Sequence, residues 1–153
     1  MRIAMTGTQK GMNAFQMSEC WILLHLFRPK EVHHGGCVGA DKNFHDIVRH
    51  LPGPSLKVHC HPAWDKVGDQ MADCYGDKNY QSLPPLVRNQ EMVMQGVDGL
   101  WAFPHQERMI VRSGTWATVR YALKADRRVF VITPTKFLIW QSGRDDVDVT
   151  ALR

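Results

Sequence analysis

The sequence predicts an α/β fold in which helices pack on both faces of a mostly parallel sheet. Short apolar runs alternate along the chain with segments whose apolar residues recur at the helical period. One of these runs, Arg128–Ile132, is almost continuously apolar, as strands buried on both faces of a parallel sheet are. A second segment, Glu31–Asp41, reads as a strand, a turn with three glycines and the start of a helix. Repetition of this strand–turn–helix unit predicts a doubly wound sheet.

Five strands are expected from short apolar runs that end at glycine, proline or polar turns. They are Arg2–Thr6, Glu31–His34, Leu56–Cys60, Gly99–Phe103 and Arg128–Ile132. Phe137–Trp140 is expected as a short edge strand, so the sheet should have five to six strands. Two segments show no clear period. We expect Trp64–Leu83 to be irregular and the polar tail 141–153 to fray.

A helix is expected in each of four connections. The second helix has the clearest pattern, because four apolar residues fall at i, i+3, i+4 and i+7 and form one face: Phe44, Ile47, Val48 and Leu51. The first helix should begin after a cap at Asn13 or Ser18 and end at Pro29. The third should follow Pro84-Pro85 and run from Leu86 to about Gln95, and the fourth should begin at Gly114-Thr115.

Length and composition favour one domain, residues 1–153. Hydrophobic residues make up 44% and charged residues 22% of the chain, which is ordinary for a globular protein. The excess of 19 Lys+Arg over 15 Asp+Glu suits an anionic ligand, but no basic run of the nucleic-acid-binding kind is present. No apolar segment approaches the ~18 residues of a membrane span, and the N-terminus lacks a signal-peptide pattern. Four cysteines without a CxxC pair are expected as free thiols in the cytoplasm.

Polar turns, three of which contain glycine, follow several of the expected strands. These turns are Gly7–Lys10, Gly35–Gly39, His61–Ala63 and Pro104–Thr115. Because the carboxyl ends of parallel strands meet at one edge of a sheet, the turns should converge there, where ligands of doubly wound sheets bind. The turns at Gly35–Gly39 and Ser113–Thr115 each lead into a helix, whose free N–H groups can bind an anion. The sequence therefore predicts an anion site at this edge.

In their order, these segments resemble the SLOG superfamily of Rossmann-like proteins over roughly Arg2–Pro134. The superfamily includes the "lonely guy" phosphoribohydrolases and the Rossmann domain of DNA-processing protein A. The matching pieces are Gly7-Thr8, the segment Gly36–Asp41 with His45 further on, Arg88-Asn89 at a helix start, and Ser113-Gly114-Thr115, which is similar to a Gly-Gly-x-Gly-Thr phosphate turn. The resemblance implies a Rossmann-like fold, nucleotide binding and a tendency to form a homodimer.

One position departs from the hydrolase pattern. The hydrolases carry a catalytic glutamate three residues after the threonine of the phosphate turn, whereas this chain has Thr118 there. A hydroxyl supplies neither the negative charge nor the base that N-glycosidic cleavage requires. Glu107 is the nearest acid in the sequence and becomes the catalytic candidate if the protein is an enzyme. We therefore expect binding rather than turnover.

The resemblance and the local chemistry together give the candidate ligand-binding residues. They are Gly7, Thr8, Gly35, Gly36, Gly39, Asp41, Arg88, Asn89, Arg112, Ser113, Gly114 and Thr115. Arg112 is expected to donate a charge-assisted bond to a phosphate, and Thr115 can either cap its helix or contact that phosphate. Arg88 can bind a phosphate or ribose, or pair with an acid, since a helix start gives arginine no favourable dipole. Asp41 can cap its helix or accept a ribose hydroxyl.

The question of a metal is raised by five residues near the second and third strands: His33, His34, His59, Cys60 and His61. Alternation along the third strand puts His59 and His61 on one face and Cys60 on the other, which separates a His-Cys-His set. We therefore expect no metal site and no cofactor.

The resulting functional hypothesis is a sensor or sequestering module for a nucleotide or nucleotide-derived signal. Two alternatives stay open: a nucleoside-monophosphate N-glycoside hydrolase, and a nucleic-acid binder that resembles DNA-processing protein A. The modest charge of +4 weighs against nucleic acid as a partner.

Overall fold

The computed structural model describes residues 1–53, 56–64 and 71–152. The strands are β1 Arg2–Gly7, β2 Glu31–His34, β3 Lys57–Cys60, β4 Lys78–Asn79, β5 Gly99–Phe103, β6 Arg128–Ile132, β7 Phe137–Trp140 and β8 Val147–Asp148. The helices are α1 Ala14–Phe27, α2 Ala40–Arg49, α3 Pro85–Met94 and α4 Gly114–Lys124, followed by a 3₁₀ turn at Thr150–Leu152.

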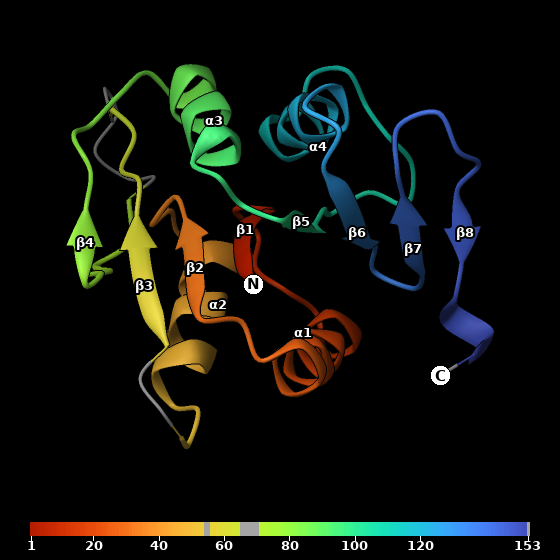
Figure 1. Cartoon of the computed structure of the whole chain (residues 1–153), viewed down its shortest axis with the longest axis horizontal. Coiled ribbons are helices and arrows are strands. Elements are labelled where there is room, and N and C mark those ends of the chain that lie inside the picture. Colours follow the sequence, from red (N-terminus) through yellow and green to blue (C-terminus); the bar gives the residue numbers. More distant parts are fainter. Residues whose placement is uncertain (54–55, 65–70, 153) are drawn as a thin grey trace.

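The α/β class is confirmed, but the sheet has eight strands rather than the expected five to six. The eight strands lie in the order β4-β3-β2-β1-β5-β6-β7-β8 (Figure 1). Strands β1 to β6 run parallel to one another, whereas β7 pairs antiparallel with β6 and β8 pairs antiparallel with β7 at one edge. The sheet is therefore mixed. Its strand order reverses between β1 and β5, the point at which an open α/β sheet leaves a crevice at its carboxyl edge.

The two additional strands come from segments expected to be irregular. Within Trp64–Leu83, Lys78–Asn79 pairs with β3, and residues 65–70 of that segment lie outside the described residues. In the tail, Val147–Asp148 pairs with β7, and the Thr150 hydroxyl accepts a bond from the Phe137 N–H at 2.7 Å. Both strands are polar dipeptides, so tertiary pairing rather than an apolar pattern produces them.

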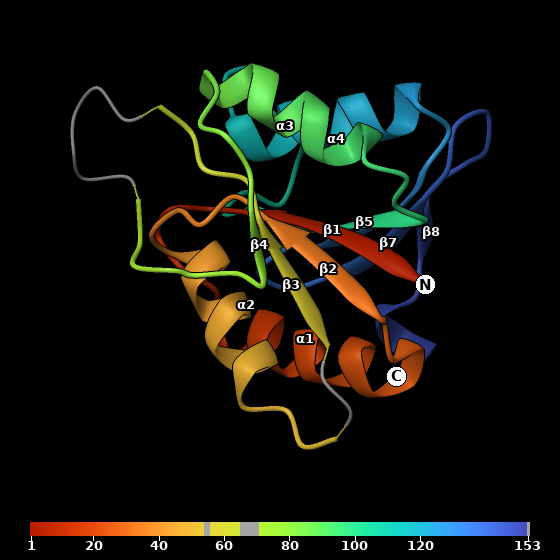
Figure 2. The same cartoon turned by 60° about the vertical axis from the view of Figure 1, so that its left-hand side comes forward.

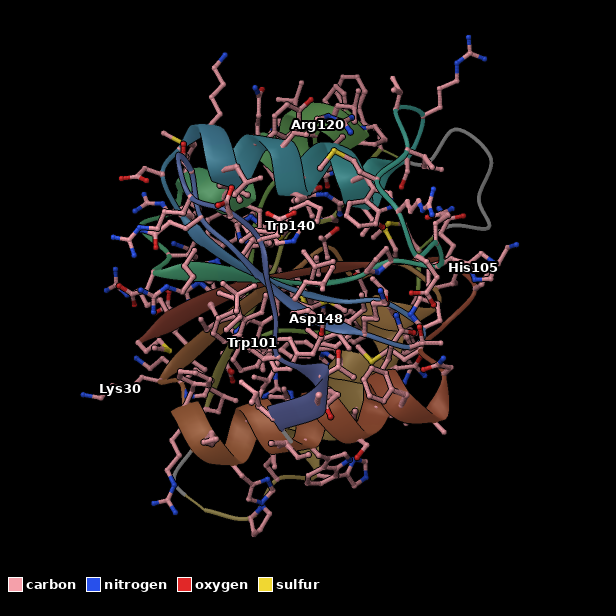
Figure 3. The ribbon with its side chains drawn as sticks, turned by 90° about the vertical axis from the view of Figure 1, so that its right-hand side faces the viewer. Lys30, Trp101, His105, Arg120, Trp140 and Asp148 are labelled. Atoms are coloured by element: carbon pink, nitrogen blue, oxygen red, sulfur yellow. The ribbon has the colours of Figure 1, made fainter. Side chains whose placement is uncertain are left out.

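Two helices cover each face of the sheet. Helices α1 and α2 lie on one side, and α3 and α4 lie on the other (Figure 2). Each layer has its own apolar core. Trp101 belongs to the core on the α1/α2 side and Trp140 to the core on the α3/α4 side, as Figure 3 shows. The Trp140 ring stacks on Trp116 of α4 at 5.7 Å, which fixes α4 against the sheet.

Helix α1 begins at the expected cap. The Asn13 side chain accepts the Gln16 N–H at 2.8 Å, and the Gln16 side chain accepts the Asn13 N–H at 3.1 Å, which is a reciprocal capping box. The buried Gln16 amide also donates to the carbonyl groups of Pro104 and Ile132 at 2.8 Å each. The start of α1 is therefore tied to the loops that follow β5 and β6. Within the described part of the chain, no helix combines the length and apolarity that crossing a membrane would need.

Candidate functional site

A cleft of about 350 Å³ opens at the carboxyl edge of the sheet, beside the point where the strand order reverses. Nine of the twelve candidate ligand-binding residues line it: Gly7, Thr8, Gly35, Asp41, Arg88, Asn89, Ser113, Gly114 and Thr115. They come from the ends of β1 and β2 and from the starts of α2, α3 and α4. The cleft size lies within the range of small-molecule sites.

Two of the remaining candidates, Gly36 and Gly39, do not line the cleft. Gly39 has φ +86°, and a Cβ there would come within 2.4 Å of the Gln9 carbonyl carbon. The next residue, Ala40, donates its N–H to the Thr8 carbonyl at 2.9 Å. Gly39 therefore allows the backbone after β1 to contact the start of α2 closely. It supports the wall of the cleft without lining it.

Arg88 lies at the back of the cleft and is only 6% exposed. Its Nη1 donates to the carbonyl groups of Gly35 at 2.9 Å and His61 at 2.7 Å, and its Nε donates to the Asn89 side chain at 2.7 Å. These bonds hold the ends of β2 and β3 to α3. Arg88 is thus a structural clamp at the cleft wall, and it does not form a close ion pair with an acidic side chain in the described chain.

Asp41 is buried beside this clamp. Its side chain does not cap α2, which corrects one of the two roles expected for it: the N-cap residue is Gly39, and Asp41 Oδ2 instead accepts the Cys37 N–H at 3.1 Å. Burial raises the pKa of Asp41, while the Arg88 charge and the backbone bonds oppose that rise. Among the described residues that line the cleft, Asp41 is the one carboxylate.

The start of α4 forms another wall. Ser113, not Thr115, is the N-cap, and its hydroxyl accepts the Trp116 N–H at 3.3 Å. Gly114 and Thr115 follow it at the first helical positions and line the cleft. Thr118 is fully buried, donates its hydroxyl to the Gly114 carbonyl at 2.8 Å, and lies outside the cleft lining.

Arg112 and Glu107, the two charged residues expected near the start of α4, do not line the cleft. Arg112 is exposed on the loop before α4 and is not among the cleft-lining residues. Glu107 also lies outside the lining, and its carboxylate accepts a bond from the Thr133 hydroxyl at 2.5 Å.

Lys10 and His105 are among the cleft-lining residues that were not assigned from the sequence as ligand-binding residues. Lys10 Nζ donates to His105 Nε2 at 3.4 Å across the mouth, and both line the cleft. Trp64 lies at the rim with a ring that is 55% exposed, while its indole N–H is fixed to the Ser82 carbonyl at 2.9 Å. The convergence of turns indicated the segments of Lys10 and His105, but no local pattern separates these two side chains from surface residues.

Among the described residues, two side-chain groups could hold a metal, and both lie outside the cleft lining: His34, His45 and Cys60, and Glu31, His33 and His59. Comparison of the chain with protein-family models, with curated proteins and with solved structures found no match.

Proposed function

We propose that the cleft binds a nucleotide or a nucleotide-derived signal. The observation that carries this proposal is the convergence of separate turns, from residues 7–10, 35–41, 88–89, 105–106 and 113–115, on one cleft at the carboxyl edge of the sheet. In open α/β sheets this edge, beside the reversal of strand order, is where such ligands bind. The resemblance to SLOG proteins supports the same ligand class.

The chemistry of the cleft suits a ligand with one anionic and one flat end. Gly114 and Thr115 begin α4 and line the cleft, so the first N–H groups of this helix and the positive end of its dipole would be available to a phosphate. Lys10 adds a cation at the mouth. At the rim, the half-exposed Trp64 ring offers a surface for stacking a base.

Binding without turnover is the favoured role. Thr118 is buried against Gly114, so a glutamate placed there would not reach the cleft without repacking α4. A sensor or a sequestering module needs only the binding geometry.

A hydrolase is the second candidate, and the position of Asp41 is the observation that favours it. Burial raises its pKa, which is the direction a carboxyl group needs to donate a proton to a leaving base. Asp41, rather than Glu107, would then be the acid.

The test compares two variants that each remove one positive charge. Adenosine 5′-monophosphate is titrated calorimetrically into the protein, into Lys10→Ala and into Arg112→Ala. Lys10→Ala should weaken binding by about 1.5–3 kcal/mol, the range for a lost charge-assisted hydrogen bond. Arg112→Ala should leave binding unchanged, because its side chain is exposed outside the cleft. Equal losses would show that only net charge matters and would remove the cleft as the site.

Turnover is measured separately by chromatography of base released from nucleoside monophosphates over hours. The expected result is no release above the uncatalysed rate. If base is released by the unaltered protein but not by Asp41→Asn, and this variant still binds the monophosphate, the protein is a hydrolase and the proposed sensor role is wrong.

A further inference from the structure

Outside the cleft, a group of ionisable side chains lies on the sheet face that α3 and α4 only partly cover. Glu31 and His33 are two positions apart on β2, and His59 is the register partner of His33 on β3. Alternation along each strand directs all three to the same face. The arrangement therefore depends on the pairing of β2 with β3 and not on the sequence of β3 alone.

The ligand atoms of these residues are already close together. Glu31 Oε1 lies 2.7 Å from His33 Nε2 and 3.8 Å from His59 Nδ1, and all three atoms lie within 4.8 Å of one another. Ligand atoms around a tetrahedral Zn²⁺ lie about 3.3 Å apart, given metal–ligand distances of about 2.0–2.2 Å. Side-chain shifts below an ångström would thus complete the set, and β-strands provide a rigid base for it.

Solvent reaches this group of three side chains, although the side chains are largely packed. The side chains of Glu31 and His59 are 19% and 13% exposed, while His33 is 1% exposed. The Tyr80 hydroxyl lies 3.2 Å from His59 Nδ1, and Arg2 Nε lies 3.7 Å from the other carboxylate oxygen of Glu31. A metal ion can enter from the solvent side while the imidazole rings stay fixed by packing.

His61 supplies the supporting hydrogen bond that such sites need. As the structure stands, His33 Nε2 donates to Glu31 Oε1 at 2.7 Å, and His33 Nδ1 lies 2.8 Å from His61 Nε2. When a metal takes the place of the Nε2 proton, both rings can change tautomer, so that His33 Nδ1–H donates to His61 Nε2 and His33 Nε2 is free for the metal. His61 Nδ1 is buried and has no hydrogen-bond partner among the described residues, so no bond there fixes the His61 tautomer. The pair can therefore shift its protons to suit a bound ion.

The second group, His34, His45 and Cys60, is not suited to a metal. The Gly36 N–H donates to His34 Nδ1 at 3.0 Å, which places the ring proton of neutral His34 on Nε2. That nitrogen faces both His45 Nδ1, at 2.9 Å, and Cys60 Sγ, at 3.6 Å. Because Nε2 carries the proton, it has no lone pair for a metal.

We propose that Glu31, His33 and His59 form a site for a divalent transition-metal ion of the Zn²⁺, Co²⁺ or Ni²⁺ type. Two imidazoles and one carboxylate are ligands that these ions accept, whereas Mg²⁺ and Ca²⁺ prefer oxygen alone. The three protein ligands leave the remaining position to water. The proposal does not depend on nucleotide binding, because none of its residues lines the cleft.

The experiment uses protein without a histidine tag, titrated calorimetrically with Zn²⁺ and followed by visible and near-ultraviolet absorption with Co²⁺. One ion should bind per chain. Glu31→Gln and His59→Asn should each weaken Zn²⁺ by at least tenfold. His25→Asn, at an exposed histidine on α1, and Cys60→Ser should leave the affinity unchanged.

The Co²⁺ spectrum of the unaltered protein gives an answer even if a variant misfolds. It should show ligand-field bands without a thiolate charge-transfer band. No binding, equal binding by the unaltered protein and His59→Asn, or a thiolate band from Cys60 would each overturn the proposal.

Discussion

One face of the sheet contains two regions of opposite chemistry. Under α3 and α4, the residues of β1, β5 and β6 on this face are apolar and fully buried: Ala4, Leu100, Ala102, Val129 and Val131. Ala4 is in register with His33 of β2, and His33 is in register with His59 of β3. One strand away from Ala4, the same face thus carries ionisable side chains.

Helix cover explains the difference between these two regions. Beneath the helices, a charge or an unpaired polar group would carry its full desolvation cost. Over β2 and β3, Glu31 and His59 stay 19% and 13% exposed, so water and neighbouring polar groups stabilise them. The covered region gives the sheet its rigidity, and the half-open region can hold reactive groups in fixed positions. A single sheet thereby combines stability with binding chemistry.

The largest expected effect comes from placing a histidine in the covered region. Val131→His should lower the free energy of unfolding by about 4 kcal/mol, since it both overpacks the core and buries an unpaired polar ring. The reciprocal change, His59→Val, should alter stability by no more than about 1 kcal/mol. Urea denaturation of both variants measures the contrast. Similar losses at the two positions would mean that helix cover does not distinguish the two regions.

A smaller effect follows from acid, through the histidine that is fully buried on the other face. Burial lowers the pKa of His34 to about 3, from an ordinary value near 6.5. Between these values the unfolded chain binds the extra proton and the folded chain does not. Stability is therefore complete above about pH 6.5 and falls as the pH drops towards 3.

The His34 contribution between pH 7 and pH 4 should be a loss of about 3 kcal/mol, at about 1.4 kcal/mol per pH unit. Denaturation midpoints at a series of pH values measure it. His34→Asn should reduce the slope without abolishing it, because burial also lowers the pKa of His61 to about 3. His50→Asn, at an exposed histidine, should leave the slope unchanged. An equally steep profile in His34→Asn would assign the acid sensitivity to other groups.

Sequence reasoning predicted strands with apolar runs best, and Glu31–His34 and Phe137–Trp140 match the observed strands at both ends. Gly99–Phe103 and Arg128–Ile132 match the observed strands at both ends, because apolar runs bounded by Gly, Pro or charge leave little ambiguity. The edge strands Lys78–Asn79 and Val147–Asp148 could not be predicted, since their polar residues form strands only when a neighbour pairs with them. Edge pairing is a property of the folded chain.

The candidate site shows the same limit. Gly114 and Thr115 were identified because a helix start has a local signature. Lys10 and His105 were not, because 95 residues separate two side chains that meet only in the fold. His33 and His59 were considered from the sequence as metal ligands and set aside for a related reason. Alternation describes one strand, whereas their grouping with Glu31 depends on the register between two. Contacts between side chains of different strands leave no pattern in the amino-acid sequence.

The smallest expected effect concerns the outer edge of the half-open region. Lys78 Nζ lies 4.5 Å from the centroid of the Tyr80 ring, which also stacks on the His61 ring at 3.9 Å. An exposed cation–π contact contributes about 0.5–1 kcal/mol, so Lys78→Met should lower the free energy of unfolding by about 0.5 kcal/mol. Lys57→Met removes an exposed lysine from the adjacent strand and serves as the charge-matched control, with no change expected. Thermal and urea denaturation of the two variants measure the difference. A loss above about 2 kcal/mol in Lys78→Met would reveal a buried contact. It would show that β3 and β4 are covered as fully as the strands beneath α3 and α4.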